Sequence, residues 1–148
     1  MNEYASVDSV QNVQAVFPEW HRMEQVDVMS NDELDELPFG AIELDASGMI
    51  LRYNAAETAI SGMASSEVVG RNFFTEIAPC TNVITFAGRF REGIAREDLN
   101  HVFPYLFAFD PPLEVWIRLY YSRNSRSSWV FVVRREESEA AAATSNKD

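Results

Sequence analysis

The sequence predicts an α+β domain in which a five-stranded antiparallel sheet is flanked by helices and covered by an N-terminal helical cap. One observation is a β-hairpin signal, since two short apolar segments are joined by a turn that contains Asp and Gly. Another is the strand-like alternation of apolar residues in the last third of the chain. The third is the helical spacing between these two regions. The predicted strands cover residues 40–44, 49–53, 100–109, 113–121 and 128–135.

The chain divides into a cap at 1–36, a main domain at 37–135 and an acidic, Ala-rich tail at 136–148. Its 148 residues and 47% apolar content suit one hydrophobic core. Apolar residues recur at helical spacing in the cap, at Val13, Val16, Phe17, Trp20 and Met23. We expect Phe17 and Trp20 to dock on the sheet, because exposed aromatic side chains are costly in a soluble protein; a free interaction tail is the alternative. The tail is expected to be disordered.

The helices between the strands have recognisable ends. Ser30 and Glu33 have the spacing of a capping box, which starts a short helix through about residue 36. Asn54 is a helix cap after the second strand, and short helices follow as far as residue 78. The longest helix is expected at about 85–96, where the apolar residues lie on one side. Pro104 places the third strand at a sheet edge, because proline cannot donate a ladder hydrogen bond.

The charge of the chain argues against two classes of partner. There are 23 acidic and 12 basic residues, which gives a net charge of −11. Such a surface repels nucleic acids and anionic lipids, so neither is an expected partner. There is no apolar run of about 18 residues that could form a transmembrane helix, and the chain does not begin with the charged and then apolar segments of a signal peptide. We therefore expect a cytoplasmic protein, monomeric or weakly dimeric.

Cys80 is the one cysteine of the chain, and no internal disulfide is open to it. It is an inert core side chain, or it acts as a nucleophile, a ligand, a redox centre or an attachment point. Pro79 places it at a helix end or in a loop. A metal site is not expected, because one cysteine with His21 and His101 lacks ligand spacing.

Two segments look like motifs common to PAS domains: Gly-Met-Ile-Leu-Arg-Tyr-Asn-Ala-Ala at 48–56 and Val-Gly-Arg-Asn-Phe-Phe at 69–74. Tyr53, Glu57 and the segment Ala-Pro-Cys-Thr at 78–81 are more specific. With them the chain resembles one family, the photoactive yellow proteins, over about residues 31–135. The resemblance implies a PAS fold and p-coumaric acid (4-hydroxycinnamic acid) bound covalently to Cys80 as a thioester.

By this resemblance, Tyr53 and Glu57 hydrogen-bond the phenolate of the chromophore, and Ser61 bonds the Tyr53 phenol. Phe73, Phe74, Phe107 and Trp129 wall the pocket or fill the core. Glu57 also has a plain structural reading, because Asn54 and Glu57 have the spacing of a capping box. Met63 departs from the family, whose familiar members have an arginine that shields the pocket.

The function implied is that of a blue-light photoreceptor and not an enzyme. The chromophore isomerises from trans to cis, Glu57 gives up its proton, and partial unfolding of the cap signals to an unknown downstream protein before thermal recovery in the dark. One alternative is a PAS ligand-binding or interaction module without chromophore. The other is a thiol enzyme or redox sensor built on Cys80, although neither histidine lies in a partner motif.

Overall fold

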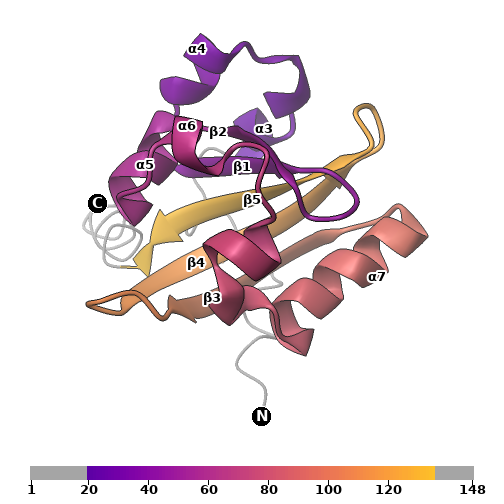
Figure 1. Cartoon of the computed structure of the whole chain (residues 1–148). Helices are drawn as coiled ribbons and strands as arrows, with labels where there is room; N and C mark the ends of the chain where they lie inside the picture. The colour runs from indigo at the N-terminus through magenta and orange to yellow at the C-terminus, as the bar shows by residue number, and fades with distance from the viewer. Residues whose placement is uncertain (1–19, 136–148) are drawn as a thin grey trace, which may run out of the picture.

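Five strands form one antiparallel sheet within residues 20–135, the part of the chain that this computed structural model describes (Figure 1). The strand order is β2-β1-β5-β4-β3, which confirms the predicted α+β class and the five-stranded sheet. The strands are β1 (Gly40–Leu44), β2 (Ile50–Tyr53), β3 (Asn100–Phe107), β4 (Leu113–Ser122) and β5 (Ser127–Arg134). The predicted strand positions are confirmed, with ends that differ by one or two residues.

The β1–β2 hairpin is closed by its own turn residues. The Asp45 carboxylate accepts hydrogen bonds from the backbone N–H groups of Ser47 and Met49, both at 2.9 Å. Gly48 has a positive φ of 95°, and a Cβ there would lie 2.9 Å from the Phe74 ring. Glycine is therefore required at this point of the turn.

Strand β5 lies in the middle of the sheet, and its side chains are buried on both sides. Val130 and Val132 belong to one apolar cluster, while Trp129 and Phe131 belong to another on the opposite face. Two cores therefore share one sheet. Strand β3 is at the edge, as Pro104 predicts.

The larger core is covered by a run of short helices between β2 and β3. They are α5 (Ala55–Ser61), α6 (Ser65–Val68), η2 (Phe73–Ile77), η3 (Pro79–Thr81), η4 (Ile84–Gly88) and α7 (Arg89–Arg96). The helix predicted at 85–96 begins as the π-helical turn η4 and continues as α7. Its buried residues are Phe86, Ala87, Phe90 and Gly93.

The smaller core lies under the cap, which comprises α3 (Trp20–Met23), η1 (Val26–Val28) and α4 (Asn31–Asp35). Figure 1 shows α3 and α4 well away from α7. The predicted capping box is confirmed: Ser30 Oγ accepts from the Glu33 N–H at 3.1 Å, and Glu33 Oε1 accepts from the Ser30 N–H at 2.8 Å. The predictions for Phe17, for the Trp20 side chain and for the tail concern parts of the chain outside the described structure.

Polar contacts tie the cap to the sheet. Asp27 accepts hydrogen bonds from Trp129 Nε1 at 3.1 Å, from Ser125 Oγ at 2.9 Å and from Ser122 Oγ. The Arg52 guanidinium donates to the Met29 carbonyl at 2.8 Å. These bonds hold η1 and the residue after it against β2, β5 and the β4–β5 turn.

A second contact uses a buried cation. Arg118 on β4 is fully buried and pairs with Glu24 of the cap at 3.2 Å. Its Nε also donates to Asn100 Oδ1 at 3.0 Å. Removing a partner from such a group leaves a buried charge unsatisfied, so the cap and the sheet depend on each other here.

No helix in the described residues is long and apolar enough to cross a bilayer. Within the same residues, no cluster of three His, Cys, Asp or Glu side chains could hold a metal ion.

Candidate functional site

The junction between β2 and α5 places Tyr53 and Glu57 close together. Tyr53 ends the strand, and Asn54 caps the helix by accepting the Glu57 N–H at 3.1 Å. The same Asn54 oxygen accepts from the Ala41 N–H at 2.9 Å, so the cap also fixes the start of α5 to β1. The Asn54 N–H donates to the Ala41 carbonyl, at 3.1 Å. The capping box is therefore only half made, and the Glu57 carboxyl is not used in it.

The Glu57 carboxyl is buried, with 3% of the residue exposed. Its Oε1 has no hydrogen-bond partner among the described residues. Burial raises the pKa of Glu57 to about 8, while Arg134 acts in the opposite direction. The side chain is thus a neutral acid at pH 7, with hydrogen-bonding capacity that the described protein groups leave unused.

Gly40 on β1 makes room for this carboxyl. A Cβ at position 40 would lie 2.0 Å from Glu57 Oε1, which no real contact allows. Any other residue at position 40 would therefore displace the carboxyl or the strand. The glycine has no unusual φ, so its role here is one of space.

Tyr53 shares a hydrogen bond of 2.6 Å with Ser61, between the phenol and hydroxyl oxygens. The Tyr53 pKa is raised by burial and by the nearby Glu57, against the opposing effect of the Ser61 bond. The phenol is therefore protonated at neutral pH and can donate. Met63, which follows Ser61 closely, is partly buried against the same core.

Cys80 lies in the 3₁₀ turn η3, half-buried against the larger core. The turn is held by Thr81, whose N–H and Oγ1 donate to the Ala78 carbonyl at 2.9 Å and 2.6 Å. The Tyr105 phenol on β3 donates to the Cys80 carbonyl at 2.5 Å. The backbone at the thiol is therefore fixed from two sides.

Aromatic rings surround this region on the same face of the sheet. Phe73 and Phe107 are buried in the cluster that contains Tyr53 and against which Cys80 packs. Phe107 stacks on Phe109 with ring centroids 5.0 Å apart. Of the two roles expected for Trp129, the structure supports core filling, because alternation along β5 turns its ring toward the cluster under the cap.

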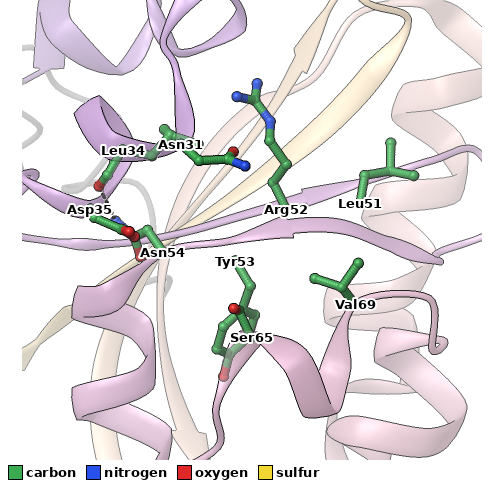
Figure 2. A pocket seen from close by; sticks show the side chains of 9 residues that line it. All are labelled: Asn31, Leu34, Asp35, Leu51, Arg52, Tyr53, Asn54, Ser65 and Val69. Carbon is green, nitrogen blue, oxygen red and sulfur yellow. Dashed lines mark hydrogen bonds between the residues drawn. The ribbon is translucent and has the colours of Figure 1, made fainter.

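A cleft lies along the edge strand β2, between α4 and α6 (Figure 2). Figure 2 shows Arg52 and Tyr53 leaving β2 on opposite sides, Arg52 toward the cap and Tyr53 toward α6. Nine residues line the cleft: Asn31, Leu34, Asp35, Leu51, Arg52, Tyr53, Asn54, Ser65 and Val69. Of the expected site residues, this cleft contains Tyr53.

Three residues around the site were missed by sequence reasoning. Gly40 spaces Glu57, Tyr105 holds the Cys80 backbone, and Arg134 acts on the Glu57 carboxyl. Each is far from its partner in sequence and reaches it through the sheet. Of the three, only Tyr105 could have been found from the sequence, because it belongs to the alternating aromatic residues of β3.

Residues 29–135 match the PAS fold family. A photoactive yellow protein from Rhodothalassium salexigens is 46% identical over 107 residues, which are 72% of this chain and 86% of that protein. One from Cereibacter sphaeroides is 40% identical over 99 residues, 66% of this chain and 80% of that protein.

Solved structures give the same relation. The photoactive yellow protein domain of the sensor histidine kinase Ppr from Rhodospirillum centenum superposes with a TM-score of 0.71 at 43% identity, covering 74% of this chain and 97% of that domain. The PAS domain of the quorum-sensing receptor RpfR from Cronobacter turicensis has a TM-score of 0.55 at 18% identity, over 68% of this chain and 96% of that domain, which shows the shared fold. The chain described here belongs to the photoactive yellow protein family of PAS-fold sensory proteins.

Proposed function

We propose that this protein is a blue-light photoreceptor that carries p-coumaric acid as a thioester on Cys80. The observation that supports it most is Glu57, a buried acid whose Oε1 has no hydrogen-bond partner in the described part of the chain. An unpartnered buried polar atom is costly, and a bound group that accepts a hydrogen bond would remove the cost. A phenolate is such a group. The similarity to relatives named photoactive yellow protein supports a phenolate chromophore at this position.

The residues present fit that chromophore. Cys80 is the attachment point, Tyr53 and Glu57 are the two donors, and Ser61 orients the Tyr53 phenol. Phe73 and Phe107 provide the apolar surroundings. Once bound, the coumaroyl group supplies absorption of visible light and trans–cis isomerisation. Because a phenol has a pKa of about 10, two protonated donors are needed to favour its anion at neutral pH.

In the lit state, Glu57 would release its carboxyl proton toward the bound phenolate and would be left as a carboxylate. Its surroundings disfavour that charge, since burial alone raises the pKa of Glu57. A buried charge costs several kcal/mol, which is comparable with the stability of a whole domain. Partial unfolding that lets water in is the expected release. The cap is the segment we propose to detach, because the contacts that tie η1 to the sheet include polar ones around Asp27 and Arg52, for which entering water competes.

A downstream signalling protein would then read the detached cap. The related domain from Rhodospirillum centenum is part of a sensor histidine kinase, which supports a role in signal transduction. Return of the proton to Glu57 in the dark would let the cap dock again.

The test is an absorption spectrum of the apoprotein after reaction with activated p-coumaric acid, before and after blue illumination. The control is Cys80→Ala, which removes the attachment point and leaves the Thr81 and Tyr105 contacts to the backbone. We expect a visible band that bleaches in light and recovers in darkness, and no band in the variant. An adduct that absorbs like a neutral coumaroyl thioester would contradict the phenolate site. No adduct at all would favour the module without chromophore.

A further inference from the structure

Arg134 is a cation on the same side of the sheet as Glu57. It lies at the end of β5, two residues beyond Val132, which pairs with Gly40 on β1. Residues two apart in a strand share a face, so Arg134 lies on the face of the larger core with Val132. Its Nη2 donates to the carbonyl of Ala59 on α5 at 3.2 Å. The guanidinium therefore lies against the helix that carries Glu57.

Both side chains contain a buried atom whose hydrogen-bonding capacity is unused. Nε of Arg134 and Oε1 of Glu57 are each buried, and neither finds a partner in residues 20–135. Unmet buried donors and acceptors are rare in folded proteins and mark strained or functional positions. Here a cationic donor and an acidic acceptor are both left unsatisfied beside one helix.

We propose that Arg134 is the counter-ion of Glu57: its guanidinium stabilises the carboxylate that remains when Glu57 has given up its proton. This inference rests on the proposed function for its role in light, but the ionic relation itself exists without a chromophore. Arg134 would be a positioning residue for the proton, acting through Glu57 and not on the chromophore directly.

The other charged groups around α5 do not replace Arg134 in this role. Tyr53 on β2 is protonated, because burial raises its pKa. Asp35 on α4 accepts the Ala55 N–H at 2.8 Å, outside the core. Glu43 on β1 pairs with Arg52 at 2.7 Å on the cap side of the sheet. Arg134 is the charged group that lowers the Glu57 pKa, against the larger effect of burial.

The counter-ion would set how readily Glu57 releases its proton. With Arg134 present, the carboxylate formed in light is less costly, so more of it accumulates before the cap detaches. Without the cation, the same carboxylate would draw its proton back faster. Arg134 therefore adjusts the yield and lifetime of the lit state.

The first measurement uses the apoprotein, so that it does not depend on pigment formation. The titration of Glu57 is followed by carbon-13 NMR of labelled glutamate carboxyls, assigned with Glu57→Gln. Arg134→Gln removes the charge and keeps a polar side chain, while Arg134→Lys keeps the charge. Arg135→Gln is the matched control: it makes the same change in net charge, but Arg135 stacks on Trp116 of the cap side, 5.5 Å from the ring centroid.

We expect Arg134→Gln to raise the Glu57 pKa by roughly one unit, as expected for loss of a nearby cation. The lysine variant should stay close to the native value, and Arg135→Gln should not move it. Near-ultraviolet circular dichroism checks that each variant is folded. A Glu57 titration unchanged in a folded Arg134→Gln protein, or shifted equally by Arg135→Gln, would overturn the proposal.

The second measurement uses the loaded protein and the infrared carbonyl band of protonated Glu57. In Arg134→Gln, we expect a smaller light-induced loss of this band and a faster return than in Arg135→Gln. Equal loss and equal return in the two variants would exclude a role in light. If no pigment forms, the proposed photoreceptor fails, while the NMR titration still decides the ionic relation.

Discussion

The raised pKa of the buried Glu57 carboxyl predicts how the free energy of unfolding changes with pH. Its pKa is about 8 in the folded protein and 4.5 in an exposed chain. The folded state therefore holds this proton more tightly than the unfolded state. By linkage, the stabilising contribution is fully present below pH 4.5 and is lost as the pH rises toward 8. The loss is about 1.4 kcal/mol per pH unit in this window, or roughly 4–5 kcal/mol in total.

Glu57→Gln isolates this contribution, because glutamine has nearly the same shape and does not titrate. The assay is urea unfolding of the two apoproteins at several values between about pH 5 and pH 9, with the difference in unfolding free energy taken at each pH. Other groups titrate in both proteins and cancel in the difference. We expect the native protein to lose stability relative to the variant as the pH rises. A difference that is flat with pH would refute the neutral, buried state of Glu57.

Three other predictions concern the space that Gly40 leaves for Glu57, the attachment of the cap by Asp27, and the Tyr53 phenol as a hydrogen-bond donor. Gly40→Ala should destabilise the protein by about 1–3 kcal/mol in urea unfolding, because the new Cβ overlaps Glu57 Oε1; Gly88→Ala, with no contact under 3.5 Å, is the control that should show no such loss. Asp27→Ala should cost about 1–3 kcal/mol and speed limited proteolysis of the cap, since Asp27 accepts three hydrogen bonds; an unchanged digestion rate would argue against its role in holding η1. Tyr53→Phe should move acid bleaching of the loaded pigment to higher pH, because the phenolate loses a donor; bleaching at the native pH would remove Tyr53 from the site.

Local patterns were enough to predict the elements of the fold, while the PAS arrangement was predicted from the resemblance. The capping box at Ser30, the turn at Asp45 and the alternation of the last three strands each depend on neighbours within a few residues. Pro104 even placed β3 at the edge, because the missing N–H is a property of one residue. The start of the long helix was less regular than predicted, since a π-helical turn at Ile84–Gly88 still satisfies the apolar spacing.

The surroundings of the site depended on contacts across the sheet. The half-made capping box illustrates this: the spacing of Asn54 and Glu57 is correct, but the Asn54 N–H is taken by Ala41 on β1. Sequence spacing cannot show which of two acceptors a backbone N–H will choose. The same holds for Arg134, whose contact with α5 follows from strand order and not from any local motif.

The fixed backbone at Cys80 has a mechanical consequence. Tyr105 and the Thr81 hydrogen bonds hold the backbone of η3 in place, so the Cys80 side chain starts from a rigid attachment point. Under the proposed function, strain in a group attached to Cys80 would not be relieved at η3 and would pass to the other end of that group, which Tyr53 and Glu57 would hold. Tyr105→Phe, which removes the hydrogen bond to the Cys80 carbonyl, should then lower the photochemical yield of the loaded protein.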